Sequence, residues 1–176
     1  MKKYFFFLFF FFSSFVLFAQ SDSIYLFCYF KGNGDGLHYA YSKDGLTWQT
    51  LFNDSIVLKP TVSKDKLFRD PCIVKGADGK YHMVWTVSWN DKGIGYSSSA
   101  DLVNWAPQQF IPVMAHKKDV RNCWAPEIIY DKGAYMIYWA STIPGRFPAT
   151  DSGGDSKYNH RMYFVTTKDF KQYSKA

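Results

Sequence analysis

The sequence predicts an all-β fold of repeated, blade-like units, and three observations support this. First, a seven-residue motif recurs as Ser42–Trp48, Ser99–Trp105 and, more weakly, Thr167–Tyr173. Second, short runs rich in aromatic and β-branched residues recur about every ten residues, with turn signals between them. Third, no window has the period of an amphipathic helix. The motif aspartates are 57 and 68 residues apart, a spacing typical of propeller blades or a similar radial array.

Residues 1–19 have the pattern of a signal peptide. Lys2 and Lys3 precede an apolar stretch, 4–19, that ends in a small residue, Ala19. A membrane anchor is disfavoured because these 16 residues fall short of the ~20 that span a bilayer, and the following chain is polar and rich in turns. We therefore expect an exported protein, periplasmic or extracellular, with no membrane span after the signal is cleaved.

The charge and the cysteines exclude several classes of function. The formal net charge of +6 falls to about +4 once Lys2 and Lys3 are removed, and the remaining basic residues are scattered. Nucleic-acid binding would require a basic patch, so we do not expect the protein to bind nucleic acid.

The three cysteines leave at least one thiol unpaired. A Cys72–Cys123 bridge stays open as an alternative to free, buried cysteines, which we favour. The cysteines and histidines lack metal-ligand spacing, so neither a metal nor a cofactor is expected.

The predicted strands fall into three units that together form an incomplete propeller over residues 20–176. Each unit combines aromatic strands, turns marked by Gly, Asp or Asn, and a strand that leads into the motif. The first unit (24–59) has strands at 24–30, 37–42 and 56–59. The second unit (67–113) has strands at 70–74, 81–89 and 94–98. The third unit (123–176) has strands at 125–130, 134–140 and 161–166, with a polar insertion at 141–160. We expect each unit to be a four-stranded antiparallel blade.

The repeated motif itself is interpreted as structural. Its aspartate is expected to cap a turn through its side chain, because Asp commonly bonds to backbone N–H groups two residues on. Its aromatic residue is expected to pack between blades. The chemistry should therefore lie on another strand of the blade.

Two acids stand out on the first strands of the second and third units. Asp70-Pro-Cys-Ile-Val aligns with Ala125-Pro-Glu-Ile-Ile, so Asp70 and Glu127 each replace an apolar counterpart. A carboxylate on an otherwise apolar strand is costly to desolvate and needs a partner or a function. Asp70 could instead cap a turn before a proline. Glu127 could instead pair with Arg121 or Arg69.

These strands and the motif resemble glycoside hydrolase family 43, the five-bladed β-propeller glycosidases that include arabinosidases and xylosidases. The resemblance rests on Phe68–Val74, Trp124–Tyr130 and the S-x-D-x-x-x-W ends, and it covers 24–176. It implies that about three of five blades are present. It also implies that Asp70 is the general base and that Trp124, with Ala125 and Pro126, lines the pocket. The family's second aspartate and its acid, a glutamate, lie on later blades and have no counterpart here. We therefore expect an N-terminal portion of a longer enzyme.

The resemblance implies an oligo- or polysaccharide substrate that contains arabinose, xylose or galactose, and hydrolysis with inversion. Two alternatives stay open. A propeller fructosidase would share the Arg-Asp-Pro sequence at 69–71, but the N-D-P-N-type motif of those enzymes is missing from 24–66. A non-catalytic carbohydrate-binding propeller would need no acid.

Five further residues are candidates for substrate binding. Trp89 and Trp124 lie beside turns or strand ends, where an aromatic face can stack on a sugar, although core packing is an equal alternative. Arg146 and His160 belong to the long insertion, and loops over a rigid scaffold often contact ligands. The alternative for these two is a solvated loop. Glu127 completes the set because it follows the Trp-Ala-Pro sequence.

Overall fold

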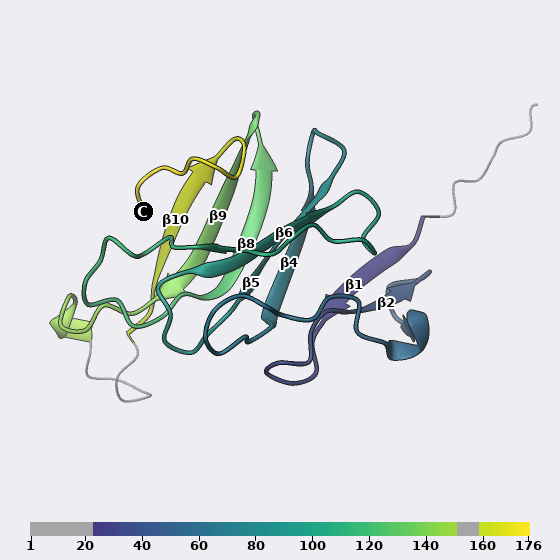
Figure 1. Ribbon diagram of the computed structural model, residues 1–176, viewed down its shortest axis with the longest axis horizontal. Helices are drawn as coiled ribbons and strands as arrows, with labels where there is room; N and C mark the ends of the chain where they lie inside the picture. Colours follow the sequence, from purple (N-terminus) through teal and green to yellow (C-terminus); the bar gives the residue numbers. More distant parts are fainter. Residues whose placement is uncertain (1–22, 151–158) are drawn as a thin grey trace, which may run out of the picture.

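The computed structural model describes residues 23–150 and 159–176, and its strands form three antiparallel sheets (Figure 1). The predicted signal peptide, 1–19, lies outside the described residues. Two short 3-10 turns, Phe52–Asp54 and Pro148–Thr150, are the only helical elements in the described part of the chain. The first sheet contains β1 (Tyr25–Tyr29), β2 (His38–Ser42) and β3 (Gln49–Thr50). The second contains β4 (Arg69–Lys75), β5 (Tyr81–Thr86), β6 (Ile94–Ser99) and β7 (Gln109–Ile111). The third contains β8 (Trp124–Asp131), β9 (Ala134–Ser141) and β10 (Arg161–Thr167). The predicted all-β class is therefore confirmed.

Cross-strand pairs show that the three sheets follow one plan. In successive sheets Tyr29 lies opposite His38, Trp85 opposite Gly95, and Trp139 opposite Tyr163. His38, Gly95 and Tyr163 each lie four residues before the hydroxyl residue of the motif, so β1, β5 and β9 are equivalent, and so are β2, β6 and β10. It follows that β4 and β8 are equivalent first strands, and the described residues contain no such strand in the first sheet.

The expectation of four strands in each unit holds only for the second sheet, because the first and third sheets have three described strands each. The prediction of a strand at 56–59 is wrong. This segment makes only an isolated bridge between Leu37 and Leu58, and β3 is the strand that pairs with β2. Pro60 follows directly and has no N–H group with which to continue a ladder.

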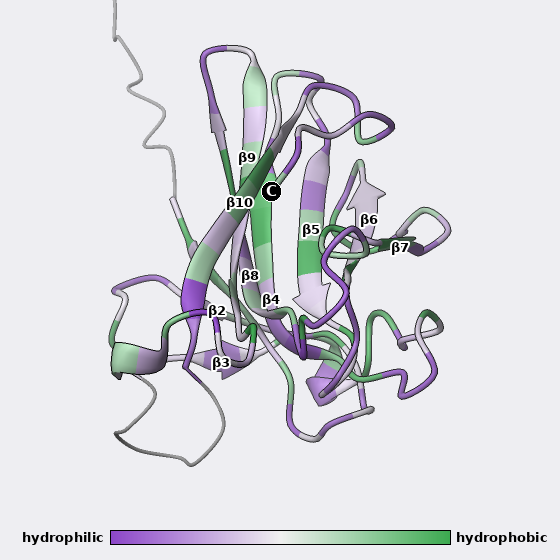
Figure 2. Ribbon diagram, turned by 90° about the vertical axis from the view of Figure 1, so that its left-hand side faces the viewer, coloured by the Kyte–Doolittle hydropathy of each residue, from purple (hydrophilic) through white to green (hydrophobic). Residues whose placement is uncertain are grey.

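Two apolar clusters fill the spaces between neighbouring sheets. One lies between the first and second sheets and includes Leu37, Phe68 and Trp85. The other lies between the second and third sheets and includes Val84 and Trp139. Successive residues of β5 thus point into different clusters, as strand geometry requires. Figure 2 shows hydrophobic stretches within β5 and β9. The second sheet is therefore packed on both faces, which makes it the most enclosed support for a site.

The repeated motif caps a turn in all three sheets, as predicted. Asp101 accepts hydrogen bonds from the backbone N–H groups of Val103 and Asn104 at 2.9 and 2.7 Å. Asp44 and Asp169 make the equivalent bonds. These bonds hold the pKa of Asp101 and of Asp44 well below the usual range of an aspartate. The motif is therefore part of the scaffold.

The aromatic residue of the motif packs against a core cluster in two of the three copies. Trp105 contacts the cluster between the first and second sheets, and Tyr173 the cluster between the second and third. Trp48 does not follow the prediction, because it is 43% exposed. Its ring contacts Phe27 of the same sheet, with centroids 5.6 Å apart. No described sheet covers that face of the first sheet.

The second and third sheets are joined near their β4–β5 and β8–β9 turns by His82, which is buried. Its Nδ1 lies 2.9 Å from the Tyr96 hydroxyl, and its Nε2 lies 3.1 Å from both Asp78 Oδ1 and the Tyr135 hydroxyl. The ring also stacks on Phe170 with centroids 4.4 Å apart. A buried polar group with partners on both ring nitrogens fixes the two sheets relative to each other.

Candidate functional site

The first strands of the second and third sheets contain the same backbone irregularity. Asp70 and Ala125 both have left-handed φ values, of 52° and 46°. In each strand the pairing register shifts at this point, which is the mark of a β-bulge. Non-glycine residues rarely adopt this conformation, and a bulge redirects the side chain that it carries. The alignment of Asp70 with Ala125 is therefore confirmed by the backbone.

The Asp70 carboxylate is held by a buried hydroxyl group. Thr86 Oγ1, at the end of β5, donates a hydrogen bond to Asp70 Oδ2 at 3.0 Å. The same oxygen accepts a hydrogen bond from the backbone N–H of Ala125 at 2.8 Å. A turn-capping aspartate would instead accept bonds from backbone N–H groups close in sequence. Thr86 thus connects the carboxylate of one first strand to the backbone of the next.

Arg69 lies beside this bulge but is held by other groups. Its guanidinium lies over the rings of Phe30 and Trp89, at 4.8 and 5.1 Å from their centroids. Its Nη1 donates to Asn33 Oδ1 at 2.9 Å. Within the described residues no ion pair joins Arg69 to its sequence neighbour Asp70. Arg69 instead ties the first sheet to the aromatic end of the second.

Three of the predicted binding residues come together at this end of the sheets. Trp124 Nε1 donates to the backbone carbonyl of Trp89 at 3.1 Å, and the two rings meet edge to face with centroids 5.6 Å apart. The His160 ring lies 5.1 Å from that of Trp124. Asn122 Nδ2 donates to His160 Nε2 at 3.2 Å, and burial lowers the pKa of His160. The result is a neutral, aromatic surface that is linked through Arg69 to the bulge at Asp70.

The other two predicted binding residues make different contacts. Glu127 is exposed on β8 and accepts a hydrogen bond from the hydroxyl of Tyr138, which lies opposite it on β9. This bond raises the pKa of Tyr138. The suggested ion pairs of Glu127 with Arg121 or Arg69 are not found among the described residues. Arg146 packs over the rings of Phe147 and Tyr163, at 5.7 and 5.9 Å.

Sequence reasoning missed Thr86, Asn33 and Asn122, which hold the predicted residues in place. The signal for Thr86 was present in the repeat. Arg69 lies opposite Thr86 and Trp124 opposite Ala140, so Thr86 and Ala140 are equivalent. The unit that has an aspartate at the bulge also has a hydroxyl residue next to it, and the other unit has alanine at both places.

The three cysteines are free, as expected, but only Cys123 is buried, whereas Cys28 and Cys72 are half-buried. Burial raises the pKa of Cys28 to about 11 and that of Cys123 to about 12, so these thiols stay protonated at neutral pH. Within the described ranges no three His, Cys, Asp or Glu side chains group as metal ligands. The same residues contain no helix that is long and apolar enough to cross a membrane.

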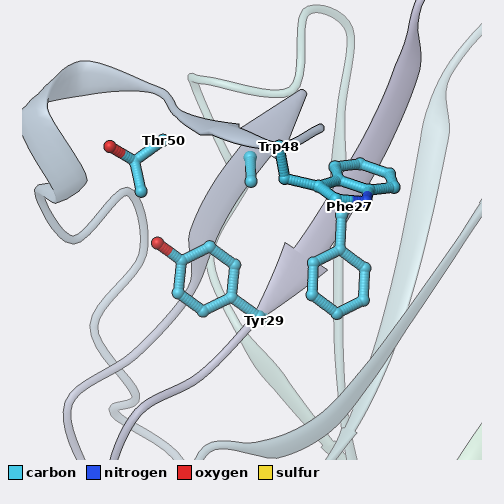
Figure 3. A pocket seen from close by; sticks show the side chains of 5 residues that line it. Phe27, Tyr29, Trp48 and Thr50 are labelled. Carbon is cyan, nitrogen blue, oxygen red and sulfur yellow. The ribbon is translucent and has the colours of Figure 1, made fainter. Parts of the chain in front are cut away.

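An open pocket of about 440 Å³ lies on the uncovered face of the first sheet (Figure 3). Phe27, Tyr29, Ala40, Trp48 and Thr50 line it. The Phe27 and Tyr29 rings lie nearly parallel, with centroids 5.9 Å apart. Among the described residues, its lining contains no carboxylate or imidazole, and the hydroxyl of Tyr29 donates its proton to Asp54.

Solved structures share this arrangement at low sequence identity. An α-L-arabinofuranosidase from Clostridium thermocellum matches with a TM-score of 0.56 and 14% identity, over 82% of this chain and 44% of its own. A family 32 β-fructofuranosidase from Bombyx mori matches with a TM-score of 0.56 and 17% identity, over 86% of this chain and 35% of its own. A family 43 endo-arabinanase from Bacillus licheniformis matches with a TM-score of 0.53 and 17% identity, over 86% of this chain and 49% of its own. The chain thus spans less than half the length of each structure, and its sheets form an arc of a five-bladed type of β-propeller.

Among curated proteins, no sequence matches this chain. A family model described as "Probable glycosyl hydrolase domain", related to glycoside hydrolase family 43, matches residues 22–176. This match covers the three sheets and the bulge at Asp70. The chain therefore belongs to this glycosyl hydrolase family.

Proposed function

We propose that this chain supplies the general base and part of the sugar-binding wall of an exported glycosidase. Its substrates would be oligo- or polysaccharides that contain arabinose, xylose or galactose. The observation that carries the proposal is Asp70, a carboxylate on a first strand of the propeller that is bonded to a buried hydroxyl. The aromatic residues Trp89 and Trp124 lie at the same end of the sheets, and Arg69 contacts Trp89.

In the proposed reaction the glycosidic bond is hydrolysed with inversion. Asp70 takes a proton from a water molecule while the water oxygen attacks the anomeric carbon. A carboxylic acid on the opposite side of the sugar gives its proton to the leaving oxygen. The two carboxyl groups of an inverting pair lie about 6.5–9.5 Å apart so that the water fits between them.

The acid is assigned to a part of the enzyme outside this chain. Glu127 is the only glutamate of the sequence, and its carboxylate accepts a hydrogen bond from the hydroxyl of Tyr138. A carboxylate in that role is poorly suited to donate a proton to a leaving group. We therefore propose that the sequence is the N-terminal portion of a longer polypeptide whose later sheets supply the acid.

The test compares the polypeptide that continues beyond Ala176 with its Asp70→Ala variant, on aryl arabinosides, aryl xylosides and, as a fructosidase control, sucrose. We expect release of an arabinose or xylose product of inverted configuration, detected by proton NMR. Turnover by Asp70→Ala should fall by about 10³-fold or more, whereas the melting temperature should fall by only a few degrees, because Ala125 shows that alanine fits the equivalent bulge and the main loss is the hydrogen bond from Thr86. Retained turnover would refute Asp70 as the base. Cleavage of sucrose alone would favour the fructosidase, and glycan binding without turnover would favour a binding propeller.

Residues 20–176 alone are the matched control in this assay. Large apolar side chains lie exposed on the first and third sheets, with Phe27 at 52%, Met162 at 63% and Phe164 at 53%. We expect this shorter chain to aggregate in size-exclusion chromatography and to be inactive. A monodisperse monomer that cleaves aryl glycosides would contradict the assignment of the acid to another part of the enzyme.

A further inference from the structure

The second and third sheets differ at two neighbouring positions that change together. Asp70 occupies the bulge where the third sheet has Ala125, and Thr86 occupies the position where it has Ala140. In the second sheet these two side chains are in hydrogen-bond contact at 3.0 Å. The hydroxyl residue is thus present in the sheet that has the carboxylate.

The partners of the Thr86 hydroxyl determine where its single proton goes. The N–H of Ala125 is only a donor, so Thr86 Oγ1 accepts from it at 2.8 Å. The hydroxyl proton is then left for Asp70 Oδ2, which must act as an acceptor. Thr86 is 1% exposed, so bulk water does not compete for this proton. A β-branched side chain also has few rotamers, which keeps the hydroxyl in place.

We propose that Thr86 is a positioning residue for Asp70. Its hydroxyl fixes the carboxylate through Oδ2 and leaves Oδ1 to take the proton from the attacking water. Through Ala125 the same hydroxyl sets Asp70 relative to the neighbouring first strand and its Trp124. This inference rests on the proposed role of Asp70 as general base.

The principal variant is Thr86→Val, which keeps the shape of the side chain and removes the hydroxyl. In the polypeptide that continues beyond Ala176, we expect kcat to fall by about 10- to 100-fold while KM changes by less than about threefold. Thr86→Ser restores the hydroxyl and should recover kcat to within about threefold of the parent enzyme. Ser97→Ala is the matched control, because Ser97 is fully buried and donates to the carbonyl of Ala106 rather than to Asp70. Its kcat should not change.

Thr86→Ala covers the case in which the valine variant fails to fold, because Ala140 shows that alanine fits the equivalent place. A folded Thr86→Val or Thr86→Ala enzyme with kcat within twofold of the parent would overturn the proposal. So would a Thr86→Ser enzyme as slow as Thr86→Val.

A second measurement separates this inference from the proposed function. The carboxyl ¹³C resonance of Asp70 should shift in Thr86→Val and stay in place in Ser97→Ala, whether or not the protein hydrolyses any glycoside. An unchanged resonance in Thr86→Val would overturn the positioning role. A parent protein without turnover, or an active Asp70→Ala variant, would refute the base assignment instead.

Discussion

The second and third sheets begin with the same backbone bulge and place different side chains on it. In both first strands the residue at the bulge has a left-handed φ value, and a proline follows it. Asp70 and Thr86 meet at this point in the second sheet, whereas the third has Ala125 and Ala140. Because the backbone persists where no carboxylate is present, the bulge belongs to the scaffold. The proposed chemistry comes from two side chains added to it.

The two sheets also differ around their equivalent tryptophans. Trp85 and Trp139 are both fully buried. Trp85 lies opposite Gly95, whereas Trp139 lies opposite Tyr163. Trp139 Nε1 donates to Ser141 Oγ at 3.0 Å, whereas Trp85 Nε1 has no hydrogen-bond partner among the described residues. Equivalent positions are therefore packed in different ways, and substitutions at them should have different costs.

The largest expected effect on stability is that of Gly95→Ala. A Cβ atom at Gly95 would lie 2.1 Å from the ring of Trp85, which is fully buried and cannot move away. We expect the free energy of unfolding to fall by about 3 kcal/mol, measured by urea denaturation. Gly32→Ala is the control, because no atom lies within 4 Å of its added Cβ. Equal stability of the two variants would show that the packing of Trp85 does not require a residue without a side chain at position 95.

The sequence predicted β4 to β6 and β8 to β10 because each of these two units combines an aromatic run with a turn signal and the capping motif, but it predicted no strand at β7, Gln109–Ile111. The prediction was less successful in the first sheet, where the composition of 56–59 indicated a strand although this segment makes only one isolated bridge, between Leu58 and Leu37. Pairing depends on which neighbours are present, and local composition does not encode this.

The candidate site was predictable where a side chain broke the repeat. Asp70 replaces an alanine of the equivalent unit, and Trp89 and Trp124 lie beside turns. The hydrogen bond of 3.1 Å between Trp124 and Trp89 depends on how the sheets pack, which the sequence does not reveal. Sheet packing also decides that His160 lies beside Trp124 while Glu127 and Arg146 contact other residues. Sequence spacing alone could not separate these three residues.

A smaller effect is expected for the two tryptophans. Trp85→Phe and Trp139→Phe remove the same atoms, but only the second removes a hydrogen bond. The first also removes a buried N–H group that has no described partner. We expect Trp139→Phe to be more destabilising than Trp85→Phe by about 2 kcal/mol, measured by urea denaturation. Equal losses would show that the indole N–H of Trp85 finds a partner such as a buried water molecule.

The smallest effect compares glycine at the two bulges. Glycine adopts left-handed φ values without the steric cost of about 1–2 kcal/mol that other residues incur, although it has more entropy to lose on folding. We therefore expect Ala125→Gly to raise the free energy of unfolding by about 0.5–1 kcal/mol, and the backbone N–H that donates to Thr86 is kept in this variant.

Asp70→Gly gains less backbone relief, because aspartate tolerates left-handed φ values better than alanine does, and it also loses the hydrogen bond from Thr86. It should therefore be less stable than Ala125→Gly by about 1 kcal/mol, and turnover should be lost. This difference, measured by urea denaturation of both variants, sets an upper limit on the contribution of the Thr86–Asp70 contact to folding. If both variants gain equally, the contact contributes nothing to folding, and any loss of turnover in Thr86→Val must come from the orientation of Asp70 alone.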